Sequence, residues 1–289
     1  MHDTAYNIGK LVIEKYFGAD QDSIVEIGSL DVNGSLRVLK PSHASYVGVD
    51  IVSGSSVDLI MTDPHSVPLP DACADLVIAS SVFEHDSFFW LSFLEMCRLT
   101  KDGGHIYVNS PSNGEIHRYP QDCWRFYPDA GSALVNWASH NGINISLVES
   151  FICDRSKDKW NDFVAIFRVG QTENRQPENC VFSSLKCRNI TWNNTLLHST
   201  SRSEDMEIID DLNTNLQSLE QGNRPLQSFS DAIFARDLVI SLYTNVLNRL
   251  PSSDEVYNKM VEIDKANLSV NDVVKTFTNS EEFKFKYIQ

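Results

Sequence analysis

Short apolar runs alternate with helical or polar segments over the first 169 residues of the chain. The first five runs have the length of strands: SIVEIG (23–28), SYVGVD (45–50), VDLIM (57–61), DLVIASS (75–81) and GHIYVNS (104–110). Before the fifth run, FFWLSFLEMCRLT (88–100) is apolar enough to form a helix packed on a sheet, and Asp102-Gly103-Gly104 end it. Alternating strands and helices are typical of an α/β domain with a mainly parallel sheet and helices on both faces.

The end of this domain is predicted at residue 169. ISLVESF (145–151) and FVAIFRV (163–169) read as two closing strands, which makes seven in total. Residues 170–228 are polar and uneven, as expected of a linker. Apolar positions inside this linker repeat with spacings of 3, 4 and 3, which predicts either a short coiled-coil seam or an amphipathic helix: Ile209, Leu212, Leu216 and Leu219.

Residues 229–289 read as a small helical domain. FARDLVISLYTNVLNR is periodic and ends at Pro251, an acidic first turn begins at Ser253, and Ser269 followed by Asp272 predicts a further helix start. The patterns LYTNVLNRLPS and VVKTFTNSEEF resemble a helical module of unknown function in bacterial surface and glycan-related proteins. The resemblance implies a glycan-synthesis protein partner, and residues 204–289 are also a candidate surface for homo-oligomer formation.

Charge and composition narrow the possible partners. The chain of 289 residues is 42% hydrophobic and 22% charged, which is typical of a folded globular protein. Its net charge of -15 has the wrong sign for a protein that neutralises nucleic-acid phosphates or anionic lipid, and both parts of the chain are acidic. We therefore expect a small-molecule or glycan acceptor and no nucleic acid.

Cysteine usage and the N-terminal sequence predict a cytoplasmic protein. The six cysteines contain no CxxC pair, so neither a zinc site nor a disulfide framework is indicated, and no metal ligand is assigned. Polar residues interrupt the first segment too often for a secretory signal, and no apolar run has the ~18 residues of a membrane span.

Glycine and aspartate residues stand where three predicted strands end. Gly28 permits a sharp turn beside the first strand, and Asp50 follows it by 22 residues at the end of the second strand. This spacing is near the ~20 residues at which an acidic side chain binds the ribose of a nucleotide. With Asp63 after the third strand, the pattern predicts one nucleotide-like ligand at this edge of the sheet.

The sequence here resembles a class I S-adenosylmethionine-dependent methyltransferase. The resemblance is carried by VEIGSLDVNGS, YVGVD, TDPHSVPLPDACADLVIASSVFEHD and GGHIYVNSPSNGEIHRYPQDCWRFYPDAG, and it covers about residues 20–140. It implies a Rossmann-like fold, S-adenosyl-L-methionine as cofactor, and contacts of Glu26 and Gly28 with the methionine moiety, of Asp50 with ribose and of Asp63 with adenine. The cofactor residues implied are Glu26, Gly28, Ser29, Asp50, Ile51, Asp63, Pro64 and Ser80.

One departure from the family pattern leaves alternatives open. The glycine-rich loop is reduced to Gly28-Ser29-Leu30-Asp31, so the second and third glycines are absent and Gly34 comes late. A non-catalytic methyltransferase-like scaffold or binding subunit of a glycan-synthesis complex is therefore an alternative. A nicotinamide-dependent oxidoreductase is another, although the sequence lacks Gly-x-Gly-x-x-Gly.

Candidate catalytic and acceptor-binding residues follow the fourth and fifth strands. His85 and His117 are candidate general bases for an acceptor hydroxyl. Tyr119, Trp124 and Arg125 are candidate acceptor-binding residues, because aromatic faces pack on the C–H surface of a sugar and Arg binds its hydroxyls. The predicted activity is O-methylation of a sugar in a surface polysaccharide or glycolipid. The competing interpretation is a capping loop with Trp124 and Phe126 buried.

Overall fold

The computed structural model describes residues 2–221, 229–266 and 268–287. Within these ranges, the side chains of residues 215–221, 229–233 and 287 lie outside the description. The chain divides into two compact units, Met1–Glu204 and Asp205–Gln289. No helix in the described part of the chain is both long and apolar enough to cross a membrane.

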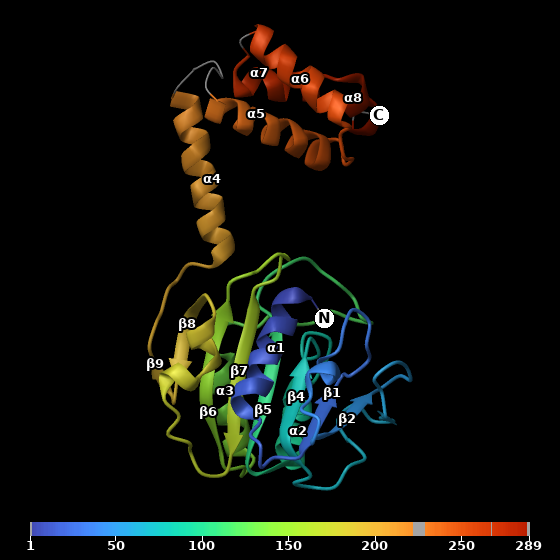
Figure 1. Ribbon diagram of the computed structural model, residues 1–289, viewed down its shortest axis with the longest axis vertical. Helices are drawn as coiled ribbons and strands as arrows, with labels where there is room; N and C mark the ends of the chain where they lie inside the picture. Colours follow the sequence, from blue (N-terminus) through green and yellow to red (C-terminus); the bar gives the residue numbers. More distant parts are fainter. Residues whose placement is uncertain (1, 222–228, 267, 288–289) are drawn as a thin grey trace. The chain divides into compact units, whose positions relative to one another are not determined.

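A nine-stranded sheet forms the centre of the first unit (Figure 1), with the strand order β3-β2-β1-β4-β5-β7-β6-β8-β9. Its strands are β1 (Ser23–Ile27), β2 (Ser45–Asp50), β3 (Leu59–Ile60), β4 (Ala74–Ser80), β5 (Thr100–Pro111), β6 (Ile145–Cys153), β7 (Asp162–Val169), β8 (Cys187–Trp192) and β9 (Thr195–Leu196). Neighbouring strands are parallel from β3 to β5 and antiparallel from β5 to β9. The sheet is thus mixed, and it fits a Rossmann-like fold with two strands more than the seven predicted.

Helices cover both faces of this sheet (Figure 1): α1 (Asp3–Tyr16) lies on one face, and α2 (Phe89–Leu99) and α3 (Ala130–His140) lie on the other. The pleat of β1 separates the two layers, since Val25 and Ile27 pack with the α2–α3 layer while Ile24 packs with the α1 layer. Glu26 shares the α1 face of the strand with Ile24, so its carboxylate enters a buried environment.

The connection from β1 to β2 differs from the expected strand-to-helix turn. Residues after Gly28 form a loop, and the helical element between Gly28 and β2 is the short 3-10 helix η1 (Leu36–Leu39). Ser35 caps η1 by accepting a hydrogen bond from the Arg37 backbone N–H. A single 3-10 turn follows because the polar Asp31–Ser35 segment contains no apolar periodicity that would bury a longer helix.

The predicted boundary at residue 169 lies too early, because β8 and β9 belong to the same sheet. Asn193 and Asn194 join them as a two-residue turn in which both residues have positive φ, +44° and +59°. Asparagine tolerates this left-handed conformation, so Asn-Asn between two strands is a hairpin signal. The polar composition of residues 170–228 concealed that signal.

Glu149 on β6 also ties the segment after residue 169 to the first unit. This buried carboxylate accepts hydrogen bonds from the backbone N–H groups of Val181 (2.7 Å) and Phe182 (3.0 Å). Burial raises the pKa of Glu149 above its ordinary value, while these donors favour the charged form. Removal of Val181 and Phe182 would leave a buried acid without its backbone donors.

We therefore expect a fragment of residues 1–204 to fold and a fragment of residues 1–169 to be less stable by more than about 3 kcal/mol, since a buried acidic group loses its donors. Urea unfolding followed by circular dichroism measures the difference. The variant Glu149→Gln, made in the longer fragment, shows how much of the loss comes from the charge. Equal stability of the two fragments would restore the earlier boundary.

The second unit contains helices among its described residues: α4 (Glu204–Gln221), α5 (Phe229–Ser241), the π-helical turn η4 (Leu242–Val246), α6 (Ser253–Ala266), α7 (Val270–Thr278) and α8 (Glu281–Tyr287). The start predicted at Ser269 is confirmed, because Ser269 and Asp272 form a capping box. Val239, Ile263 and Phe277 belong to its buried apolar cluster.

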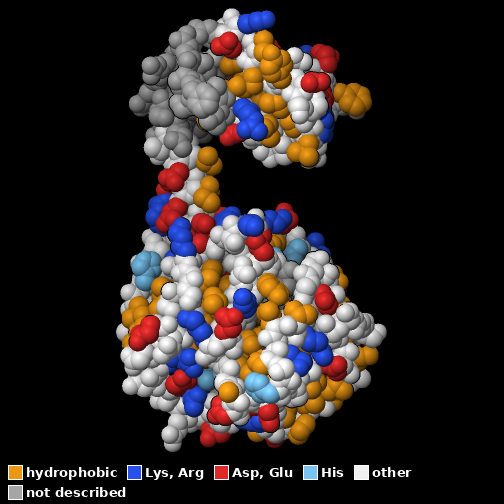
Figure 2. Space-filling model, in the orientation of Figure 1, with side chains coloured by type: hydrophobic (Ala, Val, Ile, Leu, Met, Phe, Trp, Pro, Cys, Tyr) orange, Lys and Arg blue, Asp and Glu red, His pale blue; other side chains and the backbone are white. Residues whose placement is uncertain are grey.

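Helix α4 carries part of the predicted apolar seam. Ile209 and Leu212 are 55% and 56% exposed, and hydrophobic side chains are visible along α4 in Figure 2. The side chains of Leu216 and Leu219 lie outside the described residues. The choice between a coiled-coil seam and an amphipathic helix, and with it homo-oligomer formation, stays a prediction.

Candidate functional site

The strand order reverses between β1 and β4, so the loops that follow these strands flank the crevice where ligands of open α/β sheets bind. Gly28 begins the loop after β1 with φ +72°, a conformation that favours glycine. A Cβ atom on Gly28 would lie 2.3 Å from Cγ2 of Val82, which belongs to the loop after β4. Gly28 is therefore required both by its backbone conformation and by the close approach of the two loops.

Asp50 ends β2 beside this loop and holds its backbone. Its Oδ2 atom accepts a hydrogen bond from the Leu30 N–H (3.0 Å), and its Oδ1 atom accepts one from the Val52 N–H (3.2 Å). A carboxylate offers about four acceptor positions, so two remain for ligand hydroxyls. Asp50 thus combines an anchoring role, which the sequence did not reveal, with the predicted ribose-binding position.

The remaining predicted cofactor residues lie around the same edge of the sheet. Ser29 and Ser80 are buried, and their Oγ atoms have no hydrogen-bond partner among the described residues. Ile51 and Pro64 are exposed. Asp63, also exposed, accepts a hydrogen bond from the His65 N–H through Oδ1 (2.9 Å). The orphaned hydroxyl of Ser29, next to the Gly28 turn and near the strand-end carboxylate of Asp50, fits a polar nucleotide-like ligand.

Glu26 has a partner that the sequence did not indicate. The Tyr46 hydroxyl donates a 2.9 Å hydrogen bond to its carboxylate on the α1 face of the sheet. Burial raises the pKa of Glu26 to about 7, although the hydrogen bond from Tyr46 and the charge of Arg37 oppose the shift. Glu26 can therefore change charge near neutral pH, unlike an exposed glutamate.

This shift predicts an unusual pH dependence of stability. Because the pKa of folded Glu26 exceeds the unfolded value of about 4.5, the folded state binds the proton more tightly. Its contribution to stability is present below pH 4.5 and is lost as the pH rises to about 7. Glu26→Gln, which cannot ionise, should raise the free energy of unfolding at pH 8 by up to roughly 3 kcal/mol. At pH 4.5 the gain should be small.

Denaturant unfolding of the wild type and Glu26→Gln at the two pH values measures the effect. Exposed Glu14 on α1 offers a matched control, since Glu14→Gln removes a carboxylate from the surface. A Glu26→Gln variant no more stable than the wild type at pH 8 would contradict the buried-acid interpretation.

The loop after β5 folds back over the turn that follows β4. The backbone carbonyl of Glu84 accepts hydrogen bonds from the N–H groups of Cys123 (2.7 Å) and Trp124 (3.2 Å). The Phe126 N–H donates to the carbonyl of Pro111 at the end of β5 (3.1 Å). These contacts bring residues far apart in the sequence together beside the turn that follows β4.

His85 lies in this contact region with a defined hydrogen-bond pattern. Its Nδ1 atom lies 2.5 Å from the carbonyl oxygen of Gln121, which can only accept, so Nδ1 carries the proton. The other ring nitrogen, Nε2, lies 3.7 Å from Oε1 of Glu84. Burial lowers the pKa of His85 below 6.5, which leaves the imidazole neutral at pH 7 with a lone pair on Nε2.

Glu84 is a fully buried acid beside His85. Its Oε2 atom accepts a 3.0 Å hydrogen bond from the Ser110 hydroxyl, and burial raises its pKa to about 7. The sequence interpretation assigned no catalytic or binding role to this residue. Its burial and raised pKa are features common to functional acids.

His117 meets His85 at this place. The ring centroids of the two histidines are 4.9 Å apart in an edge-to-face arrangement, and the ring of Trp160 lies 4.8 Å from His117 on another side. Nδ1 of His117 lies 3.5 Å from Oδ2 of Asp122. The two histidines proposed from sequence thus form one cluster. Trp160, in the segment between β6 and β7, was missed because no motif accompanies it.

The acceptor-binding role predicted for Arg125 is not supported by its contacts. Its guanidinium donates hydrogen bonds to both carboxylate oxygens of Asp122 (2.5 and 2.8 Å) and to the backbone carbonyls of Asn113, Glu115 and Trp124. A guanidinium has five N–H donors, and a sixth contact places Nη2 3.4 Å from Nδ1 of His117, so every donor already has a partner within the protein. Arg125 therefore holds the loop together and has no donor left for an acceptor hydroxyl.

The aromatic residues of the loop after β5 differ in exposure, so some are available for acceptor binding and others are buried. Phe126 is buried in the core against Phe83 and Phe163. Trp124 is 38% exposed and donates from Nε1 to the Asp86 carbonyl (2.8 Å), and Tyr119 is exposed. Trp124 and Tyr119 can contact an acceptor, whereas Phe126 is a packing residue.

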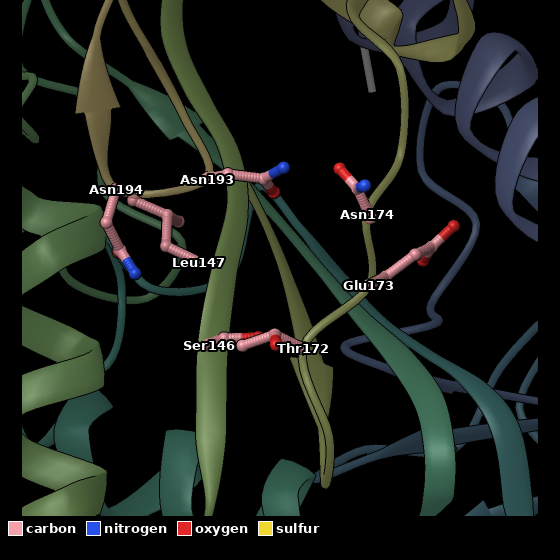
Figure 3. Close-up of a pocket in the computed structure, with 7 residues that line it drawn as sticks. All are labelled: Ser146, Leu147, Thr172, Glu173, Asn174, Asn193 and Asn194. Carbon is pink, nitrogen blue, oxygen red and sulfur yellow. The ribbon is translucent and has the colours of Figure 1, made fainter.

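A surface pocket of about 330 Å³ lies elsewhere in the first unit (Figure 3). Ser146 and Leu147 at the start of β6, Glu173, and the turn residues Asn193 and Asn194 belong to its lining. The amino end of β6 is at the sheet edge opposite the carboxyl ends of β4 and β5. This pocket is therefore separate from the crevice between β1 and β4.

The comparison with protein families identifies the segment that contains the crevice. Residues 25–108 match the family described as "Methyltransferase domain". The matched segment is similar to that family over less than half of the chain. It includes all the predicted cofactor residues and His85, and it supports S-adenosyl-L-methionine as the cofactor. The match favours the methyltransferase prediction over the nicotinamide-dependent oxidoreductase.

Several solved structures are similar to part of this chain. One is the 1,6-didemethyltoxoflavin-N1-methyltransferase of Burkholderia thailandensis with bound S-adenosylhomocysteine (13% identity, 58% of this chain and 79% of that chain, TM-score 0.46). Another is a SAM-dependent methyltransferase of Methanosarcina mazei (14% identity, 56% and 98% coverage, TM-score 0.41). The [4+2]-cyclase SpnF is also similar (13% identity, 57% and 81% coverage, TM-score 0.43). No curated protein matches the sequence.

Proposed function

We propose that this protein O-methylates a sugar of a surface polysaccharide or glycolipid, with S-adenosyl-L-methionine as the methyl donor. The observation that carries the proposal is that the candidate groups share one edge of the sheet. Gly28 follows β1 and Asp50 ends β2, while His85 lies in the loop after β4 and contacts His117. Donor and acceptor groups have to meet at such an edge for methyl transfer.

The methyltransferase domain has the residues to orient the donor. Because Gly28 has no Cβ, the loop after β1 can approach Val82 in the loop after β4. The remaining acceptor positions of Asp50 suit two ribose hydroxyls. The bound cofactor supplies an activated methyl group on a sulfonium. Orientation alone can lower the barrier by roughly 7 to 11 kcal/mol, so a strong base is not required.

A neutral histidine can accept the proton of the acceptor hydroxyl. The acceptor oxygen forms a bond to the methyl carbon, the carbon–sulfur bond breaks with its electron pair left on sulfur, and the proton passes to an imidazole nitrogen. His85 supports this role because Gln121 fixes its Nδ1 proton and Nε2 keeps a lone pair. His117 is the second candidate, and it is the more exposed of the two.

The assignment of a sugar acceptor is supported by aromatic surface beside the histidines. Partly exposed Trp124 and Trp160 and exposed Tyr119 offer faces on which the C–H surface of a sugar can pack. The resemblance of the C-terminal helices to a module of glycan-related proteins points to the same acceptor class. Arg125 serves this site by shaping the loop.

Replacement of Asp50 tests cofactor binding. Asp50→Ala removes the ribose acceptors and should weaken S-adenosylhomocysteine affinity by ten- to a hundred-fold, or roughly 1.5 to 3 kcal/mol for a hydrogen-bonding charged partner. Isothermal titration of folded samples measures the change. Asp58→Asn is the matched control, because Asp58 also accepts a backbone N–H, that of Gly48, but belongs to no predicted cofactor contact. Equal affinities of Asp50→Ala and the wild type would remove Asp50 from the site.

A second candidate function, a non-catalytic scaffold, is favoured because the protein's own groups already occupy part of the crevice. Asp50 already binds two backbone N–H groups, and Val82 packs against Gly28. Folded wild-type protein that fails to bind either S-adenosylmethionine or S-adenosylhomocysteine in the same titration would support the scaffold and reject the enzyme.

A further inference from the structure

We propose that Glu84, His85 and His117 bind a divalent transition-metal ion of the Zn²⁺ type on the acceptor side of the site. This inference rests on the proposed methyltransferase function for its role, but the metal site itself can be tested without cofactor. Two imidazoles and one carboxylate are a donor set that binds Zn²⁺ and related ions while leaving a coordination position open.

The three side chains already converge. One possible ligand atom from each lies within 4.8 Å of the others, and Nε2 of His85 is 3.7 Å from Oε1 of Glu84. Bonds of about 2.0 to 2.2 Å around a metal require ligands somewhat closer than this. His117 is the most exposed of the three side chains, so it has the most freedom to move closer to the other two.

Each proposed ligand has an outer partner that orients it. Ser110 donates to Oε2 of Glu84, the Gln121 carbonyl accepts from Nδ1 of His85, and Asp122 lies 3.5 Å from Nδ1 of His117. Such partners on the remote atom are typical of metal-binding histidines and carboxylates. They leave Nε2 of His85 for the metal, and Nε2 of His117 is available when its Nδ1 proton faces Asp122 and not the Arg125 guanidinium.

The charge around the cluster also suits a cation. Glu84 is fully buried, so an ion beside it would offset the cost of its negative charge. Arg125 is the basic side chain near this cluster, with Nη2 3.4 Å from Nδ1 of His117, but its guanidinium is already paired with Asp122. The Arg125–Asp122 pair is neutral overall, so it does not compensate a charge on Glu84, and a bound cation would favour the ionised carboxylate.

A second group of possible ligands, His2, Asp3 and Asp158, is less suitable. Nδ1 of His2 lies 2.9 Å from Asp158, and Nε2 lies 3.3 Å from Asp162. Burial opposes the charge of His2, but Asp162 and Asp158 raise its pKa above the ordinary value. Both ring nitrogens of His2 already face carboxylates of the protein, so His2 provides a natural control.

A metal held by three protein ligands would keep a position for an acceptor oxygen. Binding there lowers the pKa of a hydroxyl, which makes it a better nucleophile at neutral pH. The acceptor class that fits is a sugar with neighbouring hydroxyls, because a second hydroxyl can occupy another coordination position. With both imidazoles bound to the metal, the metal would replace the histidine base in activating the acceptor hydroxyl.

The test is a titration of the metal-free full-length chain with Co²⁺, without cofactor or acceptor, followed by visible absorption and by isothermal titration with Zn²⁺. We expect one ion per chain and a loss of affinity of ~100-fold or more in Glu84→Gln, His85→Asn and His117→Ala. Asparagine at position 85 keeps a donor for the Gln121 carbonyl. His2→Ala and His140→Ala are the controls and should bind as the wild type does.

Lack of Co²⁺ and Zn²⁺ binding by the wild type, or unchanged binding in the three ligand variants, would overturn the proposal. Circular dichroism of each variant confirms that it is folded. A parallel titration with S-adenosylhomocysteine separates the two hypotheses: cofactor binding without metal binding rejects only the metal site, and metal binding without cofactor binding rejects only the methyltransferase function.

Discussion

Replacing His117 with alanine is expected to lower the rate of methyl transfer by ~10² to 10⁴-fold while leaving S-adenosylhomocysteine affinity nearly unchanged. The imidazole lies in a cluster with His85 and Trp160, whereas the Asp50 carboxylate anchors the β1 loop. Its loss therefore removes a group that assists the acceptor hydroxyl, whether it takes the proton or holds a metal. Formation of S-adenosylhomocysteine with a panel of sugar acceptors measures the rate.

The neighbouring Arg118, which is exposed, gives a matched control for this substitution, and Arg118→Ala should keep the wild-type rate. A purely structural His117 would give the opposite pattern: a lower melting temperature with turnover within a few-fold of the wild type. In that case His85 would be the remaining candidate base. Trp124→Ala, compared in the same assay, should mainly raise the KM for the acceptor.

Replacement of Gly28 by valine is expected to abolish measurable cofactor binding and to destabilise the first unit by roughly 3 kcal/mol or more. Two separate costs contribute. The residue has φ +72°, which is strained for a β-branched side chain, and a Cβ atom would overlap Val82 at 2.3 Å. Calorimetric titration with S-adenosylhomocysteine and thermal unfolding measure the two effects.

Gly34→Val is the matched control, because Gly34 also has a positive φ, +112°, but a Cβ atom there would meet nothing within 4 Å. Gly34→Val should be destabilised by backbone strain alone. The double variant Gly28→Ala with Val82→Ala should be more stable than Gly28→Ala, since the contact is relieved. Two results would contradict this interpretation: a double variant no more stable than Gly28→Ala, or normal cofactor binding by Gly28→Val. Either would show that the site does not depend on the close contact between the two loops.

Much of the sheet and the cofactor side of the site could be predicted locally. Apolar runs such as SIVEIG and DLVIASS are long enough to identify buried strands, and they correspond to β1 and β4. Gly28 and Asp50 could be recognised because strand ends in a parallel sheet meet at one edge, so their spacing along the chain carries spatial information. The capping box could also be recognised, because Ser269 and Asp272 are close together in the sequence.

The roles of individual polar residues could not be predicted in this way. Arginine is a residue type expected to bind acceptor hydroxyls. In the folded loop, however, backbone carbonyls and the Asp122 carboxylate use all the N–H donors of Arg125. The polar segment after residue 169 looked like a linker, because β8 is short and its stability comes from pairing with β6. Pairing partners and hydrogen-bond acceptors belong to distant parts of the chain.

The sequence by itself determined the strands up to β7, the glycine turn after β1 and the acid at the end of β2, because hydrophobic periodicity and residue spacing reveal these features within short stretches of sequence. Only the tertiary structure decided that Glu84 is buried beside His85 and that His117, on a different loop, reaches the same place. The physical reason is that the loop after β5 is held over the β4 turn by backbone hydrogen bonds from Cys123 and Trp124. Backbone bonds of this kind leave no residue pattern, so the cluster they assemble appears only in the fold.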